Sequence, residues 1–96
     1  TLVDAYLKTV ESGGITIDAA YIFGSQAKGT ARETSDIDVC IISRKFKSPG
    51  IALRTLWREK TFLYAKIEPV GYSRKDFNEF ANPLVAEIKK NNIQIR

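Results

Sequence analysis

The chain has no histidine, no methionine and a single cysteine, Cys40, among its 96 residues. Without histidine, a His-ligated zinc site, Ser-His-Asp catalysis and histidine-based acid–base chemistry are excluded. Any catalysis must therefore use carboxylates, basic side chains or metal ions. A lone cysteine cannot form an internal disulfide, which favours a reducing compartment, so we expect a cytoplasmic protein.

Long apolar runs are also lacking. The longest, residues 39–42, is far too short to span a bilayer, and the N-terminus has no basic start followed by an apolar stretch of the kind that marks a signal peptide. We therefore expect no membrane association. The length and a hydrophobic content of 44% predict one domain over residues 1–96 with one modest core.

Apolar spacing and breaker residues predict alternating helices and strands. Helices are expected over residues 2–10, 26–28, 51–64, 73–80 and 83–90, and strands over residues 15–23, 36–43, 65–72 and 93–95. Pro69 within the third strand indicates an edge position or a bulge. The expected fold class is α/β (α+β), a small mixed sheet of three or four strands with helices packed on it.

Positive charge is concentrated between Arg44 and Lys60, where six basic residues stand against Glu59 alone. Such a stretch suits a polyanionic ligand or an acidic partner, although a solvated loop and helix face explains it equally well. Trp57 is expected in the core, because Leu53 and Leu56 share its helical face.

A Gly24-Ser25 turn lies between a predicted strand and a predicted short helix closed by Gly29. Glycine lets the backbone approach a ligand closely, and the first N–H groups of a helix are free to bind an anion. The Ser25 hydroxyl adds a donor, and Lys28 lies within one turn of it. Many ordinary turns have the same composition, so this pattern alone does not define a site.

Asp36 and Asp38 stand at the start of the second predicted strand. Side chains alternate along a strand, so both carboxylates face the same side, roughly 5 Å apart. At that separation their repulsion is about 3 kcal/mol for an effective dielectric constant of about 20. A divalent cation such as Mg²⁺ would relieve this repulsion, as would solvation or pairing with a nearby base such as Arg32 or Lys28.

Glu68 belongs to the third predicted strand, the expected neighbour of the second. It is therefore expected to join Asp36 and Asp38 in one acidic cluster that faces the Gly24-Ser25 turn. A third carboxylate beside two metal ligands can activate a hydroxyl nucleophile. An exposed strand glutamate next to Pro69 is the alternative interpretation.

Residues 23–29 (FGSQAKG), followed by residues 35–39 (SDIDV), resemble the signature of the nucleotidyltransferase superfamily related to DNA polymerase beta. Ten residues lie between Ser25 and Asp36, and the two motifs at this spacing are far more specific than either alone. The short length resembles the minimal nucleotidyltransferases, which are often paired with a helical HEPN-type protein. The core of the resemblance covers residues 21–42.

The resemblance implies a nucleotidyltransferase-like fold and transfer of a nucleoside monophosphate, AMP from ATP, to a hydroxyl acceptor with two Mg²⁺ ions. It assigns Gly24 and Ser25 to the β- and γ-phosphates of the nucleotide. It assigns Asp36 and Asp38 to the metal ions.

Two further positions of this resemblance depart from the usual residues. Glu68 maps to the third catalytic and metal-binding position, where the family more often has aspartate. Lys28 maps to a nucleotide-binding position where the family commonly has arginine, and it still supplies a cation for phosphate.

Three functions stay open on the sequence. The first is Mg-dependent nucleotidyl transfer, with a HEPN-type protein among the acceptors. The second is a non-catalytic, antitoxin-like binding subunit of a two-component toxin–antitoxin complex, suggested by the small size of the chain. The third, which we rank last, is nucleic-acid binding through the basic stretch between Arg44 and Lys60.

Overall fold

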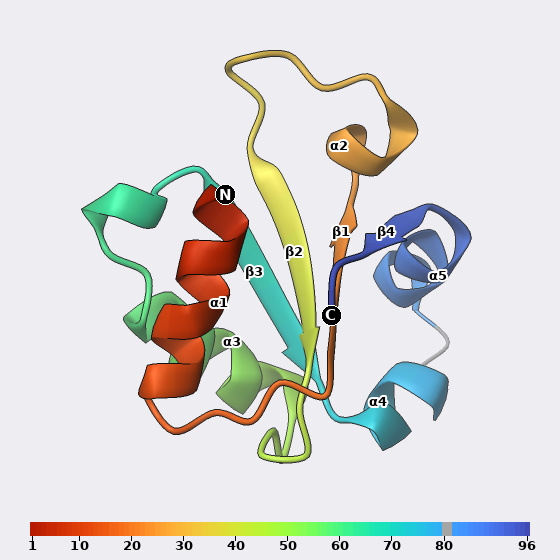
Figure 1. Cartoon of the computed structure of the whole chain (residues 1–96). Helices are drawn as coiled ribbons and strands as arrows, with labels where there is room; N and C mark the ends of the chain where they lie inside the picture. The colour runs from red at the N-terminus through yellow and green to blue at the C-terminus, as the bar shows by residue number, and fades with distance from the viewer. Residues whose placement is uncertain (80–81) are drawn as a thin grey trace.

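The chain forms a four-stranded sheet with helices on both faces (Figure 1). This computed structural model describes residues 1–79 and 82–96. Its elements in chain order are α1 (Leu2–Ser12), β1 (Ala19–Phe23), α2 (Ser25–Lys28), β2 (Ile37–Ile42), α3 (Pro49–Arg58), the 3-10 turn η1 (Phe62–Tyr64), β3 (Ile67–Tyr72), α4 (Arg74–Glu79), α5 (Pro83–Lys90) and β4 (Asn92–Gln94).

The strand order across the sheet is β3-β2-β1-β4. β1 pairs antiparallel with β2 on one side and with β4 on the other, whereas β2 and β3 run parallel. The parallel pair requires a crossover, and α3 supplies it. The sheet is therefore mixed, as predicted, and Pro69 lies in an edge strand, where its missing N–H breaks no ladder.

Alternation along the strands divides the core into two clusters, one on each face of the sheet. The first face is covered by α1 and α3, and Leu7 and Leu56 are fully buried there against Val39 and Ile41. The second face is covered by α4 and α5, and Phe77 and Ile88 are its largest contributions from helices. We call these the α1 face and the α5 face.

Local signals in the sequence explain most helix ends. Thr1 and Asp4 form a capping box at the start of α1, and Gly29 closes α2 with a left-handed φ of 74°. Ser73 accepts a hydrogen bond from the Asp76 N–H at the start of α4, as predicted, and Asn82 caps α5 in the same way.

Two predicted boundaries are wrong by more than two residues, and several others by one or two, so that Asp36 lies just before β2 rather than in it. β1 begins at Ala19 rather than Ile15, because Ala19 already pairs with Ile42, the last residue of β2, so the strand partner ends there. α3 ends at Arg58 rather than Tyr64. Tyr64 turns back toward α1, where its hydroxyl lies 3.1 Å from the Thr9 hydroxyl.

The predicted burial of one α3 face is also partly wrong. Leu56 is buried, but Leu53 is 42% exposed and Trp57 44% exposed. Leu56 and Ala52 point into the core, so the side of α3 that carries Leu53 and Trp57 faces away from the α1 face. Phe80, predicted to share a face with Phe77, lies outside the described residues.

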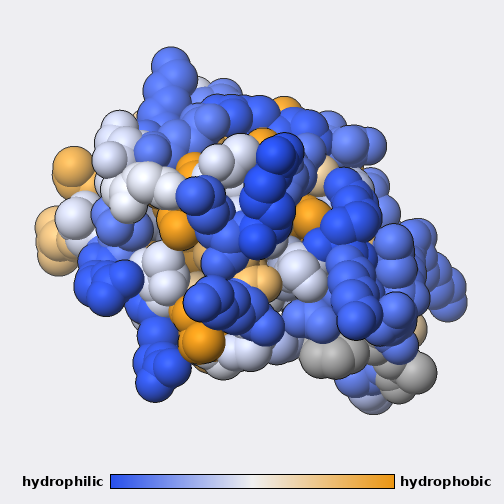
Figure 2. Space-filling view, turned by 90° about the horizontal axis from the view of Figure 1, so that it is seen from below, coloured by the Kyte–Doolittle hydropathy of each residue, from blue (hydrophilic) through white to orange (hydrophobic). Residues whose placement is uncertain are grey.

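Within residues 1–79 and 82–96, no helix is long and apolar enough to cross a membrane. Seen from below, the surface is mostly hydrophilic, with small hydrophobic areas between the charged side chains (Figure 2).

Candidate active site

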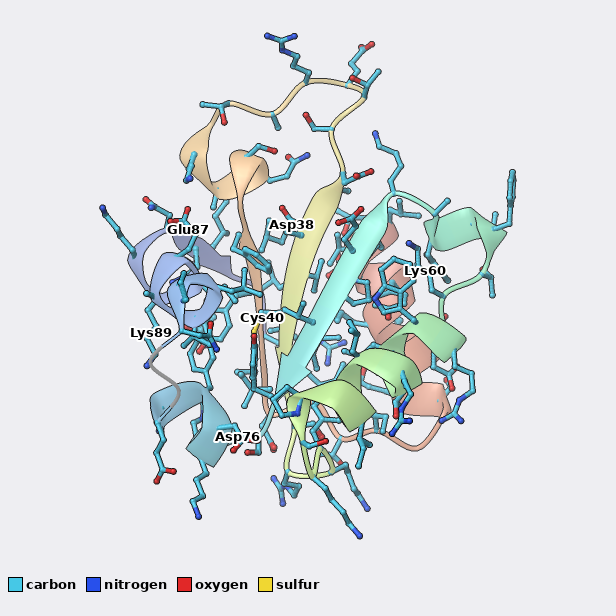
Figure 3. The ribbon with its side chains drawn as sticks, turned by 180° about the vertical axis from the view of Figure 1, so that it is seen from behind. Asp38, Cys40, Lys60, Asp76, Glu87 and Lys89 are labelled. Atoms are coloured by element: carbon cyan, nitrogen blue, oxygen red, sulfur yellow. The ribbon has the colours of Figure 1, made fainter. Side chains whose placement is uncertain are left out.

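Three adjacent strands bring the predicted site residues together at one end of the sheet. Asp38 on β2 lies opposite Phe23, the last residue of β1, and opposite Glu68 on β3. Figure 3 shows Asp38 near the end of β2 that lies closest to α2. The Gly24-Ser25 turn follows Phe23 directly, so the turn and both strand carboxylates are neighbours although they span 45 residues of sequence.

Gly24 is required for two separate reasons. Its φ of 70° and ψ of −146° belong to a region that residues with a side chain rarely adopt. In addition, a Cβ atom at this position would collide with the Oδ2 atom of Asp38. The backbone of the turn therefore lies directly against the carboxylate, with no side chain between them.

Asp36 and Asp38 differ in their surroundings. Asp36 is exposed in the segment just before β2, whereas Asp38 is half-buried on the strand. Burial raises the pKa of Asp38, and the charge of Asp36 raises it further. The pair therefore carries the unfavourable electrostatics that its spacing predicted.

Glu68 is exposed and takes part in the same electrostatic cluster. Side-chain hydrogen bonding with Asp36 raises the pKa of Glu68 most, followed by its partial burial and the charges of Asp36 and Asp38. The ammonium group of Lys60 acts in the opposite direction. A cation placed among these carboxylates would remove the repulsion that contributes to both raised pKa values.

The donor set is chemically suited to Mg²⁺, although it is not a complete protein cage. Across the described part of the chain, no group of three or more His, Cys, Asp or Glu side chains has an arrangement that would hold a metal ion by itself. Mg²⁺ commonly takes only one or two carboxylates from the protein and fills its other positions with substrate phosphates and water. Asp36 and Asp38 fit that pattern.

The two remaining predicted residues lie on α2. Ser25 is half-buried at its first position. The Lys28 ammonium forms an ion pair of 2.7 Å with Glu87 on α5, and this contact lowers the pKa of Glu87. Lys28 is thus close to the turn, but its cation is paired with a carboxylate of the protein.

One feature of the site was missed at the level of sequence. A cavity of about 250 Å³ adjoins the carboxylates on the α5 face. Its lining consists of Phe23, Asp38, Leu53, Trp57, Glu68, Pro69, Val70 and Leu84. The sequence signal for this cavity was the wide apolar surface of α3. Ala52 and Leu56 are enough to pack the helix on the sheet, so Leu53 and Trp57 are not needed for the core.

Solved structures of other proteins share this fold. A protein from Sulfolobus solfataricus, provisionally assigned as a nucleotidyltransferase and determined at 1.40 Å, matches with a TM-score of 0.69 and 19% identity, covering 97% of this chain and 75% of that one. A crystal structure of a toxin–antitoxin with AMP-PNP matches with a TM-score of 0.62 and 16% identity, covering 94% and 69%. These likenesses define a nucleotidyltransferase-type fold.

The sequence itself matches the model of the polymerase beta nucleotidyltransferase family over residues 6–95. The chain therefore belongs to the polymerase beta nucleotidyltransferase family, and the resemblance noted in residues 23–29 and 35–39 is confirmed. No curated protein gives a significant match to the chain.

Proposed function

We propose that the chain is a Mg-dependent nucleotidyltransferase that moves AMP from ATP to a hydroxyl acceptor. One observation carries the proposal: Gly24 is packed against Asp38, and Asp38 is paired in register with Glu68. A phosphate-binding turn, a metal-binding carboxylate and a third carboxylate are then side by side in three neighbouring strands. In-line displacement needs the leaving group, the reacting phosphorus and the acceptor in one line. The turn, Asp38 and Glu68 would serve these three groups in that order.

In this proposal each group has one role. Gly24 and Ser25 bind the β- and γ-phosphates, and Asp36 and Asp38 hold the metal ions. When bound, Mg²⁺ neutralises the charge that develops on the phosphate oxygens. Glu68, which is paired in register with Asp38, would be the third ligand for the metal ions and would take the proton from the acceptor hydroxyl.

The transfer balances with no other co-reactant. The acceptor oxygen forms a bond to the α-phosphorus, and the bond from the α-phosphorus to the bridging oxygen of the β-phosphate breaks. Pyrophosphate leaves on the side of the Gly24-Ser25 turn. Lys28 joins in phosphate binding only if it leaves Glu87, so we propose that ATP exchanges this ion pair for a phosphate contact.

The acceptor proposed here is a hydroxyl of a helical, HEPN-type partner protein. Two observations support a protein partner. The similar structure noted above is that of a toxin–antitoxin. In this chain, η1 holds Phe62 and Leu63 out from the surface, 94% and 73% exposed. Two large apolar side chains held in solvent are typical of a surface that another molecule covers.

The decisive test follows the α-phosphate of labelled ATP. With Mg²⁺ and a helical HEPN-type protein as the acceptor, we expect label to move to that protein, and the double variant Asp36→Asn with Asp38→Asn to lose that transfer. Asp76→Asn, at the other end of the sheet in Figure 3, is the matched control and should keep it. Transfer by the double variant would show that these carboxylates are not the catalytic ones.

The second candidate is a non-catalytic, antitoxin-like subunit that binds its partner without modifying it. The exposed Phe62 and Leu63 favour it as much as they favour an acceptor complex. A stable complex that forms without ATP, persists in the double aspartate variant and shows no label transfer would establish this function instead.

A further inference from the structure

An apolar groove runs along the α5 face between α3 and α5. The cavity of about 250 Å³ beside Asp38 adjoins a second one of about 260 Å³, and the two share Leu53, Val70 and Leu84. The lining residues of the two cavities follow β3 from Glu68, opposite Asp38, toward the other end of the strand. The second cavity reaches as far as Tyr72, the last residue of β3.

The walls of the groove are apolar side chains that the fold leaves partly in solvent. Leu53 and Trp57 come from α3 and Leu84 from α5, and Leu84 is 40% exposed. Leu53 and Trp57 stand four residues apart on α3, so their side chains are neighbours and form one continuous wall. Apolar side chains of two helices that converge on one open groove indicate a site for an apolar group.

The position of the groove relative to the carboxylates decides which group it suits. Phe23, Asp38 and Glu68 line the end of the groove that is nearest the Gly24-Ser25 turn. A nucleotide whose β- and γ-phosphates lie at the Gly24-Ser25 turn and whose α-phosphate lies at Asp38 carries its nucleoside on that same α-phosphate. The nucleoside must then lie within one ribose of Asp38, and the groove is the apolar space that begins there.

The acceptor has a different requirement. It needs to bring only one hydroxyl to the cluster, and Asp36 and Glu68 are both exposed to solvent. An acceptor can therefore approach from outside the sheet without entering the groove. The half-buried Asp38 lines the groove, the exposed Glu68 lines it at its border with solvent, and the exposed Asp36 lies outside it.

We propose that the groove binds the nucleoside of the donor triphosphate, with the base between Trp57 on α3 and Leu84 on α5. The inference rests on the proposed function, because it takes the phosphate and metal positions from it. Lys60 Nζ lies 3.8 Å from the centroid of the Trp57 ring, so this cation fixes the indole from one side. Aromatic side chains bind bases by stacking.

The lining also sets the selectivity. Apart from Asp38, Glu68 and the indole N–H of Trp57, the side chains that line the first cavity are apolar. Such a site discriminates by size and stacking rather than by hydrogen bonds to the base edge. Purine nucleotides should therefore bind more tightly than pyrimidine nucleotides, while ATP and GTP should differ by less than about tenfold.

Calorimetry with three probes in Mg²⁺ tests the proposal: ATP, CTP and inorganic tripolyphosphate. The nucleoside in the groove should make ATP bind roughly 5- to 150-fold more tightly than tripolyphosphate, the contribution expected from one stacked base. Trp57→Ala and Leu84→Ala should each remove much of this difference and leave tripolyphosphate affinity unchanged. Leu2→Ala, which removes a leucine that is 39% exposed and lies outside both cavities, is the matched control and should change neither.

The outcomes separate this inference from the proposed function. Equal affinities for ATP and tripolyphosphate, insensitive to Trp57 and Leu84, would overturn the groove assignment and leave phosphate binding intact. If neither ligand binds in Mg²⁺, the proposed function fails. Two further results would overturn the assignment in favour of another occupant. If Trp57→Ala and Leu84→Ala slow transfer but leave ATP affinity unchanged, the groove binds the acceptor. If they dissociate a dimer in sedimentation, the groove binds a second copy of the chain.

Discussion

The α1 face and the α5 face of the sheet are covered to different extents. On the α1 face, Tyr6, Leu7 and Val10 of α1 and Leu56 of α3 are fully buried. On the α5 face, Val85 and Ile88 of α5 pack against β1, but the part over β3 stays open and contains both cavities. The carboxylates Asp38 and Glu68 are on this open part.

The difference shows how a chain of 96 residues accommodates both a core and a site. Apolar burial is the main stabilising term in folding, and a small domain has little of it to spare. The α1 face supplies most of this apolar burial through a closed helix–sheet interface. The α5 face leaves apolar and charged groups uncovered, at a cost in stability that only a function explains.

The largest expected effect compares two leucines, one on each face. Leu7→Ala should lower the free energy of unfolding by about 2–5 kcal/mol, because it leaves a cavity in a closed interface. Leu84→Ala removes the same atoms from a groove wall already open to water and should cost less than about 1 kcal/mol. Urea unfolding of both variants measures the difference, and equal losses would show that the two faces are packed alike.

The next effect compares two glycines that both have a positive φ. Gly24 has φ 70° and Gly29 φ 74°, so alanine at either should cost roughly 1–3 kcal/mol of stability. Only at Gly24 does the added methyl meet Asp38, since nothing lies within 4 Å of a Cβ at Gly29. Calorimetry should show Mg-ATP binding weakened by more than about tenfold in Gly24→Ala and retained in Gly29→Ala.

In EDTA, replacing two different aspartates by asparagine should change the free energy of unfolding in opposite directions. Asp38→Asn should raise stability at pH 7 by no more than about 1 kcal/mol, because the pKa of Asp38 is raised and its charge opposes folding. Asp18→Asn should lower stability. Hydrogen bonds from Arg44 lower the pKa of Asp18, so its contribution is present near neutral pH and disappears as the pH falls through that lowered pKa.

Thermal unfolding between pH 3 and pH 7 measures both aspartate effects. Loss of stability in Asp38→Asn would mean that this carboxylate is structurally stabilising and not held unfavourably on the open face.

The smallest effect concerns Cys40, buried beneath the α5 face. Burial raises the pKa of its thiol to about 12, so it ionises in the unfolded chain well before it does in the folded one. Stability should therefore fall as the pH rises above the unfolded pKa, by roughly 0.8 kcal/mol between pH 7 and pH 9. Cys40→Ala should lack this decrease in parallel urea titrations, and an identical decrease would mean that the thiol is open to solvent.

Local patterns allowed much of the fold and of the candidate site to be predicted. The continuous apolar run of β2, the Gly29 stop and the Ser73 cap act over a few residues, and the structure contains all three. The pairing of Asp38 with Glu68 was also predictable, because consecutive parallel strands around one helix are usually neighbours.

What escaped prediction depends on distant partners. Whether Ile15 and Ile17 continue β1 is decided by where β2 ends, and Asp18 is the first residue to bond to Ile42. The exposure of Trp57 depends on how far α5 extends over the sheet. The pairing of Lys28 with Glu87 joins residues 59 positions apart, and no local rule anticipates it.

The parallel pairing of β2 with β3 also has a kinetic consequence. Asp38 and Glu68 become neighbours only after the chain between them has closed a long loop through α3. Loop closure of this kind is slow, because its entropy is lost before the strand contacts compensate. During refolding, the proposed binding of Mg-ATP should therefore be regained later than the helical circular-dichroism signal. Ligand binding would then report on the last step of folding.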